Sequence, residues 1–246
     1  MENHSRLRIS NIGINEYVLH KELVDKLPDK SKKKEQIEKF RLDTEKSLRI
    51  RENVPDVSDE KVRQFYDMLS DSVFSAAEEF KIPLPEVRLK VSWLIHRYDE
   101  KKNAYSEGYA GASANPTDVW MIKIHPKAIS KVLHETNSDM AKLDIDELIY
   151  HESKHLQSYI YDRSGYVQSR EKLETIKHKI SKEDFFEVKE FLTSREIDGL
   201  KAQIKAIEKF SPKDVVFSLY RNLILILRKQ ELKSRMKRRK ELNVDF

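Results

Sequence analysis

Two histidines four residues apart, with a glutamate beside the first, are the residues of this sequence best suited to chemistry. They form the run His151, Glu152, Ser153, Lys154, His155. On a helix, a spacing of four places both imidazoles on one face, where a single divalent ion can contact both. Zinc suits such a pair if a third protein ligand arrives and one position stays open for water. Glu152 is placed to take a proton from that water, so the run predicts metal-assisted hydrolysis.

The spacing is specific in a chain of this composition. The 246 residues include 8 histidines, and a chance match to the five-residue pattern is expected only about 0.03 times. Leu148, Ile149 and Leu156 are apolar and can bury the other face of the helix. We therefore favour a metal site over the plainer alternative, in which both histidines are solvated or hydrogen-bonded helix residues.

The chain contains no cysteine, which restricts both the metal ligands and the class of protein. Any metal must be held by nitrogen and oxygen, and disulfides, thiolate sites and cysteine nucleophiles are excluded. Charged residues make up 36% of the chain and the net charge is only +5, as expected for solvated helix faces. Because the first residues are polar and no stretch of about 18 uncharged apolar residues follows, we expect a cytoplasmic protein with no membrane partner.

Hydrophobic periodicity predicts the elements that must position the histidine pair. Ser58 can cap a helix over residues 58–81, and the pair falls on a helix over residues 146–163. A later helix is predicted over residues 181–210, because Ser181 and the acid three residues later form a start like a capping box. Between the first two helices, apolar and polar residues alternate as in short strands. These strands cover residues 87–95, 104–110 and 119–125, with a loop at residues 111–116 before the last.

The two ends of the chain differ in composition from this core, which we place at residues 58–210. Residues 1–57 are rich in Lys and Glu and predict an N-terminal helical arm. Residues 211–246 predict a last helix that is apolar at first and basic over residues 228–240. The sequence therefore indicates a core domain with a helical addition at each end.

The histidine run and the order of these elements resemble the gluzincin-type zinc metallopeptidases. The resemblance implies that His151 and His155 are zinc ligands, that Glu152 is the general base, and that a glutamate on a following helix is the third ligand. Glu196 is the candidate for that glutamate. The resemblance also implies an α+β, zincin-like fold that is helix-dominated with a small three-stranded sheet. The predicted strand at residues 119–125 would line the cleft, where a polypeptide substrate could pair with its edge.

Spacing supports Glu196 and leaves alternatives open. Leu192, Glu196 and Gly199 lie along one stripe of the later helix, and the small Gly199 would let two helices approach closely. Asp198 points about 200° around the helix from Glu196, so both cannot serve equally. His178 is the alternative nitrogen ligand. In the plainer reading, Glu196 is solvated and paired with a neighbouring basic residue.

Other positions depart from the family or stay open. Lys154 stands where such peptidases usually carry an uncharged residue, and the segment after Glu196 reads Ile-Asp-Gly rather than ending in Ala-Asp. The residue that would stabilise a transition state is not fixed by the sequence. The candidates are Tyr159, Tyr161, Tyr166, His178 and Tyr220.

Two other classes of function stay open besides the hydrolase. The basic residues at 228–240 could contact the phosphates of nucleic acid or of anionic lipid. The chain would then be a nucleic-acid-associated or virion-type structural protein with an inactive metallopeptidase-like core. No aromatic residues interleave with these basic residues, so a solvated helix is the plainer reading. A scaffold protein that uses only its terminal helices would bind no metal.

Overall fold

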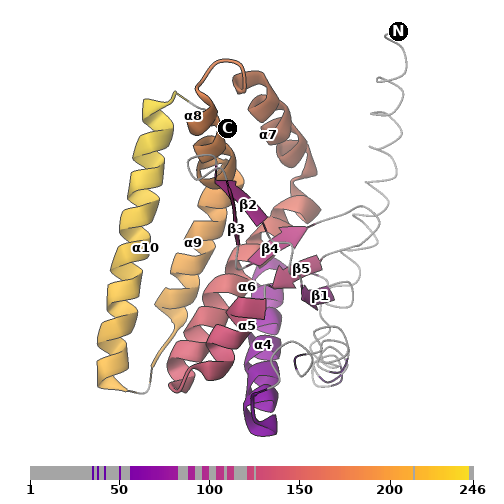
Figure 1. The fold of residues 1–246 in the computed structure, drawn as a ribbon, viewed down its shortest axis with the longest axis vertical. Coiled ribbons are helices and arrows are strands. Elements are labelled where there is room, and N and C mark those ends of the chain that lie inside the picture. The colour runs from indigo at the N-terminus through magenta and orange to yellow at the C-terminus, as the bar shows by residue number, and fades with distance from the viewer. Residues whose placement is uncertain are drawn as a thin grey trace.

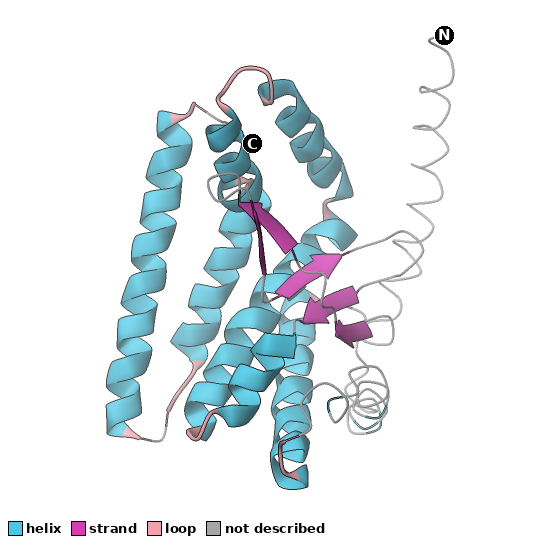
Figure 2. Ribbon diagram, viewed as in Figure 1, coloured by secondary structure: helices cyan, strands magenta, loops and turns pink. Residues whose placement is uncertain are grey.

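The computed structural model describes residues 56–82, 126–212 and 214–243, five short strands between the first two ranges, and positions 35, 38, 42 and 50. The predicted arm at residues 1–57 therefore lies almost wholly outside the described residues. The described part is mostly helical, as the sequence indicated, with long helices side by side and the strands grouped together (Figures 1 and 2). Among the described residues, no helix is long and apolar enough to cross a membrane.

Helix α4 (Asp59–Phe80) begins and ends close to where its sequence predicts. Ser58 caps it by accepting a hydrogen bond from the backbone N–H of Lys61. Lys81 ends it in the left-handed conformation, with φ at 55°. Its apolar face packs against the histidine-bearing helix in the main hydrophobic core, so α4 supports that helix from one side.

Within the described residues, five short strands follow α4, where three were predicted. They are β1 (Arg88–Val91), β2 (His96–Asp99), β3 (Ala104–Glu107), β4 (Ala110–Ser113) and β5 (Met121–Ile124). Three of them form a sheet in the order β1-β5-β4, with β1 parallel and β4 antiparallel to the central β5. The other two, β2 and β3, pair as an antiparallel hairpin.

The strand predictions were wrong in detail. The candidate at residues 87–95 contains only β1, and the next strand starts at His96. Gly111 and Ser113, which predicted a loop, lie in β4 and pair with β5. Small residues of low strand propensity form a strand here because β5 supplies their hydrogen-bond partners, which a local pattern does not show. The candidate at residues 119–125 contains β5, but β5 is central in its sheet rather than at an edge.

Helix α6 (Ser138–Tyr161) is the central element and carries the histidine pair. It begins earlier than the predicted start near residue 146, because Asn137 caps it by accepting two backbone N–H groups of its first turn. Helix α5 (Pro126–His134) precedes it. α6 packs against α4 on one side and α9 (Ser194–Lys209) on another, so both neighbours bury its apolar residues.

The segment after α6 is divided more finely than predicted. It contains α7 (Arg163–Ile176), α8 (Lys182–Glu187), the π-helical turn η3 (Val188–Leu192) and α9. The single helix predicted over residues 181–210 is therefore wrong, since the chain breaks at Thr193. Thr193 has extended backbone (φ −63°, ψ 151°), and its side chain accepts from the N–H of Glu196. This cap fixes the first turn of α9, where Glu196 lies.

Helix α10 (Val215–Glu241) runs beside α9 and reaches back to η3 (Figure 1). Asp214 caps it by accepting from the N–H of Phe217. Phe217 is buried with Leu143 of α6 and Ile207 of α9 in a second, smaller apolar cluster. This cluster packs the first half of α10 against α6 and α9, the two helices that carry the candidate ligands.

Candidate metal centre

Helix α6 brings the two histidines together one turn apart. Nε2 of His155 lies 2.9 Å from Nε2 of His151, within hydrogen-bond distance. The ring centroids are 4.6 Å apart and the ring planes are nearly perpendicular, at 89°. Both side chains are largely buried, with exposed fractions of 16% for His151 and 9% for His155. The helical spacing therefore produces a converging pair of nitrogens.

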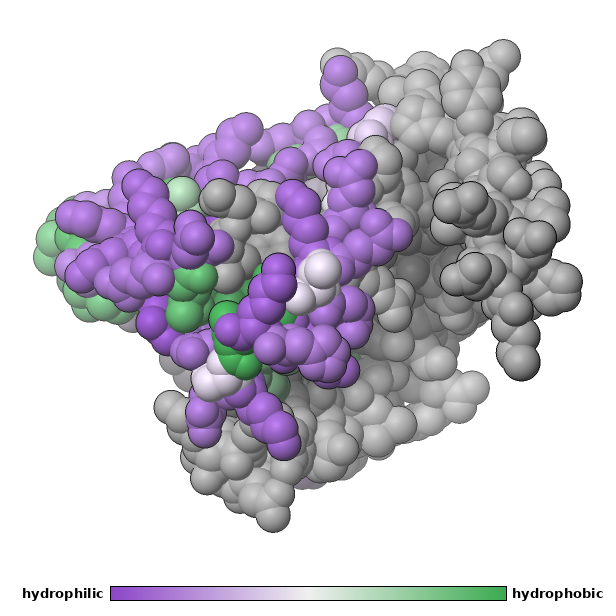
Figure 3. All heavy atoms as spheres, turned by 90° about the horizontal axis from the view of Figure 1, so that it is seen from above, coloured by the Kyte–Doolittle hydropathy of each residue, from purple (hydrophilic) through white to green (hydrophobic). Residues whose placement is uncertain are grey.

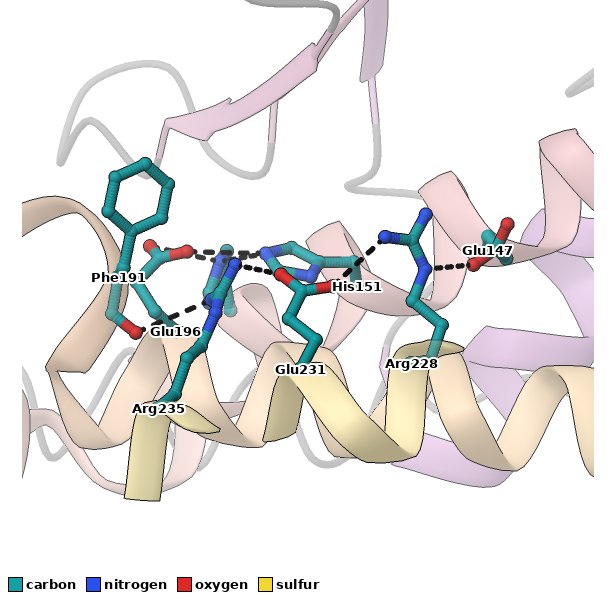
Figure 4. A network of polar contacts seen from close by, with 8 residues as sticks. Glu147, His151, Phe191, Glu196, Arg228, Glu231 and Arg235 are labelled. Carbon is teal, nitrogen blue, oxygen red and sulfur yellow. Dashed lines mark hydrogen bonds and ion pairs between the residues drawn. The ribbon is translucent and has the colours of Figure 1, made fainter. Parts of the chain in front are cut away.

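Glu196 completes the group from α9. Its Oε2 lies 3.5 Å from Nε2 of His151 (Figure 4). Its Oε1 lies 3.5 Å from Nε2 of His155. One ligand atom from each of the three residues lies within 4.8 Å of the others, so the group could hold a metal ion. The structure thus brings together the three residues that the sequence singled out as ligands.

The alternatives to Glu196 are engaged elsewhere. The carboxylate of Asp198 is 2.8 Å from Nζ of Lys201. His178 is exposed in the turn that follows α7. Arg195 is the basic residue near Glu196, with Nη2 at 3.6 Å from Oε1, beyond ordinary hydrogen-bond distance. Glu196 therefore faces the histidines rather than forming a tight pair at the surface.

Gly199 explains how α9 approaches α6 so closely. A Cβ atom at this position would lie 2.7 Å from Cε1 and 2.8 Å from Nε2 of His151, closer than Cβ contacts in folded proteins. A glycine lets the backbone of α9 pass against the ring without that clash. Glu196 lies one turn earlier on α9, so the same close approach brings its carboxylate to both rings.

Burial and mutual contact set the protonation of the three groups. Burial lowers the pKa of His155 to about 3, so this ring is neutral at pH 7. Burial would also lower the pKa of His151, but the hydrogen bond to Glu196 and the charge of Glu152 raise it above its ordinary value. Burial would raise the pKa of Glu196, but the hydrogen bond from His151 and nearby positive charges lower it to about 2. The ionised carboxylate of Glu196 and the neutral ring of His155 thus lie beside a ring whose protonated form is favoured more than in water, and a metal cation could take the place of that proton.

The donor set fits zinc. Two imidazole nitrogens and one carboxylate oxygen are a known ligand set of catalytic zinc sites, in which water or substrate takes the fourth position. Nδ1 of His155 is buried and has no hydrogen-bond partner within the described ranges, while Nε2 faces the group. Glu152 follows His151 on α6 and is itself buried. Its charge acts on His151, so it lies beside the three candidate ligands and outside their set.

Arginines of α10 brace the helices around this group, a role that the sequence analysis missed. Nε of Arg228 donates to Glu147 of α6 at 2.7 Å, on the turn before the histidine pair. Arg235 donates to the backbone oxygen of Phe191 in η3 at 3.4 Å. Glu231 accepts from both arginines and links them (Figure 4). Of the basic residues that the alternative reading places against nucleic acid, Arg228 thus contacts α6, which carries the histidine pair, and Arg235 contacts η3.

The arginines near the end of α10 also contact other helices, whereas its lysines are exposed. Arg238 contacts Asp184 at 2.6 Å and Glu187 at 3.0 Å, both on α8. Arg239 donates to Oγ of Ser194 at 3.2 Å, at the start of α9. The lysines of this segment are exposed instead. They are Lys229, Lys233, Lys237 and Lys240. The sequence could have shown that the lysines share one side of the helix, because they recur at intervals of four, four and three residues.

A cavity of about 650 Å³ borders another face of α6 and has a different character. Glu79 of α4 lies in it and contacts Lys205 at 2.5 Å and Lys209, both on α9. Asp146 of α6 contacts Lys142 and accepts from a serine hydroxyl of α4 at 2.5 Å. Each of these carboxylates has a lysine of the chain beside it, so this cluster is neutralised internally.

The candidates for a transition-state stabiliser are not gathered at the three ligands in the part of the chain that is described. Tyr161 donates to a backbone oxygen just after α4 at 2.5 Å. Tyr220 packs in the apolar cluster under α10, and His178 is exposed. The side chains of Tyr159 and Tyr166 lie outside the described residues. Assignment of this role therefore stays open.

Comparisons with protein-family models, with curated proteins and with solved structures find no significant match to this chain. The function must therefore be inferred from the side chains of the site and their surroundings.

Proposed function

We propose that the chain is a zinc-dependent hydrolase and, more narrowly, a metallopeptidase. The observation that carries the proposal is the convergence of His151, His155 and Glu196 from two helices, with ligand atoms within 4.8 Å of one another. A structural zinc site usually has four protein ligands, whereas three leave a position for water or substrate. The buried carboxylate of Glu152 beside the group adds the base that hydrolysis needs.

Each side chain has a role in the proposed reaction. His151 and His155 would hold the ion through Nε2, and Glu196 would hold it through a carboxylate oxygen. Zinc supplies a Lewis acid that lowers the pKa of a bound water to about 7 and polarises a carbonyl group. With zinc bound, Glu152 would accept a proton from the attacking water and pass it to the leaving amine. The burial of these groups lowers the local dielectric constant and strengthens their electrostatic contacts.

The sheet suggests where a polypeptide substrate would bind, and it is not the strand that the sequence pointed to. β5 is paired on both sides, by β1 and β4, so its backbone is not open to another strand. Among the described strands, β4 pairs with β5 alone, and it contacts α6. An extended peptide could add to the outer edge of β4 through main-chain hydrogen bonds, which would present its peptide bonds to α6.

The substitution Glu152→Gln tests the proposal while leaving the ligands in place. We expect zinc content to stay near one per chain, as for a single site. Turnover of a mixed fluorogenic peptide library should fall by about 10²–10⁴-fold, because a positioned base is lost. Glu171→Gln, on the exposed side of α7, is the matched control and should retain turnover. Zinc content well below one per chain in the unaltered protein, or full turnover in Glu152→Gln, would contradict the proposal.

The alternative function, a nucleic-acid-associated or virion-type structural protein with an inactive core, draws less support. It rested on the basic residues at 228–240. The arginines at 228, 235, 238 and 239 contact carboxylates, a hydroxyl or a backbone oxygen of the same chain. A nucleic-acid partner therefore stays a prediction of the sequence alone.

A further inference from the structure

The outer face of α10 is apolar over the first half of the helix. Six large side chains there have exposed fractions between 50% and 78%. They are Val215, Val216, Leu219, Leu223, Ile226 and Leu227. Their spacing of three and four residues lines them along one side, while Phe217 is buried on the inner side. Figure 3 shows hydrophobic atoms at the edge of the molecule that α10 forms in Figure 1. A contiguous exposed stripe of this kind marks an interaction site.

The second half of the same face is cationic. It carries Lys233, Lys237 and Lys240, of which Lys237 has 79% of its side chain exposed, whereas Lys229 pairs with Glu208 of α9 at 2.7 Å. The only acidic residues of α10 are Glu231 and Glu241, and Glu231 is bonded to the inward-facing arginines. Those arginine contacts fix the rotation of α10. The apolar stripe and the lysines therefore share one outer face of the folded protein.

Two kinds of occupant fit this face poorly. A second copy of the chain would be held by six apolar side chains from each copy, whereas a stable interface uses roughly 20 to 30 residues a side. Lysines of the two copies would also repel each other wherever the cationic halves met. Nucleic acid would be attracted to the lysines, but it would leave the apolar half of the face exposed to water.

We infer that the outer face of α10 binds the surface of an anionic membrane. An amphipathic helix lies in the plane of such a surface, with its apolar side chains at the boundary of headgroups and acyl chains. Lysine ammonium groups are attracted to the negative headgroups of the same leaflet. Both halves of the face therefore find a complementary environment at once. The sequence predicted no membrane partner because it contains no segment that can span a bilayer, but a helix that lies on the surface needs no span.

Vesicle co-sedimentation of the full chain tests this inference. We expect binding to vesicles of phosphatidylcholine with about a third phosphatidylserine, and much weaker binding to phosphatidylcholine alone. Leu219→Ser/Leu223→Ser should reduce binding to the anionic vesicles at least about tenfold by removing apolar contacts. Lys233→Gln/Lys237→Gln/Lys240→Gln should cause a similar loss and remove the dependence on salt. Because the changed side chains are exposed, the melting temperature should stay unchanged.

The matched control is Lys172→Gln/Lys179→Gln/Lys182→Gln, which removes the same charge from exposed positions away from α10. This variant should bind anionic vesicles within about twofold of the unaltered protein. The inference is overturned if the unaltered chain stays in the supernatant with anionic vesicles. It is also overturned if the control loses as much binding as the α10 variants. A dimer in light scattering that Leu219→Ser/Leu223→Ser dissociates, or tighter binding to a short DNA duplex than to vesicles, would assign the face to those partners instead.

Discussion

Helix α6 carries two buried polar clusters that differ in whether they contain their own cations. In the first, Asp146 contacts Lys142 and Glu79 of α4 contacts two lysines of α9. In the second, two imidazole nitrogens and the carboxylate of Glu196 face one another, and the nearest guanidinium nitrogen is 3.6 Å from that carboxylate. In the first cluster each carboxylate is already paired with a lysine. In the second, nitrogen and oxygen atoms that can coordinate a metal face a common point.

The difference shows how a structural cluster can be told from a ligand site. Buried charges are costly unless they are paired and hydrogen-bonded, and the lysines meet that requirement in the first cluster. The second cluster meets it only in part, because the contact with Glu196 raises the pKa of His151 and so favours its protonated form. A metal ion would supply the missing positive charge with better geometry. The two clusters should therefore respond differently to mutation, pH and metal.

The largest expected effect comes from removing the third ligand of the second cluster. Glu196→Ala should weaken zinc binding by more than about 100-fold, because loss of a direct ligand exceeds the 10–100-fold effect of an outer partner. Asp198→Ala, two residues away and paired with Lys201, should retain affinity. Competition with a chromophoric chelator measures both. Unchanged zinc affinity in Glu196→Ala would show that the second cluster does not bind zinc through this carboxylate.

Gly199→Ala should disturb the same cluster through packing. The new Cβ would lie 2.7 Å from the ring of His151, and overpacking of this kind costs about 1–3 kcal/mol in the free energy of unfolding. Zinc affinity should fall as well, because the ring must move. Lys201→Ala, on the exposed side of the same helix, serves as the control. Urea unfolding without metal separates the packing effect from the metal effect. A Gly199→Ala protein with unaltered stability would show that the helices can separate freely.

Zinc affinity should depend on pH through a single proton. His155, with its pKa lowered to about 3, and Glu196, with its pKa lowered to about 2, are already deprotonated above pH 5. The pKa of His151 is raised, so zinc must displace its proton whenever the pH is below that value. Affinity should therefore fall about tenfold per pH unit as the pH drops below the pKa of His151, and level off above it. Chelator competition between pH 5.5 and 8.5 measures the slope of the logarithm of zinc affinity against pH. A slope of zero or of two in the acidic part of this range would contradict the prediction.

The smallest effect is expected in the cluster that contains its own cations. Lys205→Met/Lys209→Met removes both partners of Glu79. These lysines are about half exposed, but the Glu79 carboxylate that they leave unpaired is only 11% exposed, so we expect a loss of about 1–3 kcal/mol in the free energy of unfolding; the effect on zinc binding is the smallest of the series. Zinc content should not change. Lys201→Met, which breaks an exposed pair with Asp198, is the control and should cost less. Loss of zinc in the double variant would mean that the two clusters are coupled.

The sequence could predict the site well because its parts are local. The spacing of His151 and His155 on one helix, and of Glu196 and Gly199 on another, follows from the geometry of a single helical turn. The angle between positions on a helix showed that Glu196 and Asp198 cannot both be ligands, and the family resemblance together with the stripe through Gly199 favoured Glu196. The mostly helical character of the chain was likewise visible in the periodicity of its apolar residues.

The sheet could not be predicted because its strands depend on distant partners. β4 is a strand because β5 lies beside it, although its own residues favour a loop. The break at Thr193 was missed because the apolar pattern continues across it, with Leu192 and Ile197 both buried. The inward-facing arginines of α10 could have been predicted only by plotting its arginines and lysines separately on the helix. Arginine favours contacts within a protein more than lysine does, because its guanidinium group can form two parallel hydrogen bonds.

Thr193, Glu196 and Gly199 follow one another at intervals of three residues, and each has one task. A threonine followed three residues later by a glutamate ordinarily forms a reciprocal cap, in which the glutamate side chain returns to the start of its helix. Here the threonine still caps α9, but the carboxylate is directed to the histidines of α6. Gly199 then lets the backbone of α9 pass close to the ring of His151 without a steric clash. His-Glu-x-x-His followed by Thr-x-x-Glu-x-x-Gly is therefore the combination of residues that this geometry requires, and we expect it to tolerate substitution less than the rest of the chain. It offers a way to find distant relatives after the rest of their sequences have lost any measurable similarity.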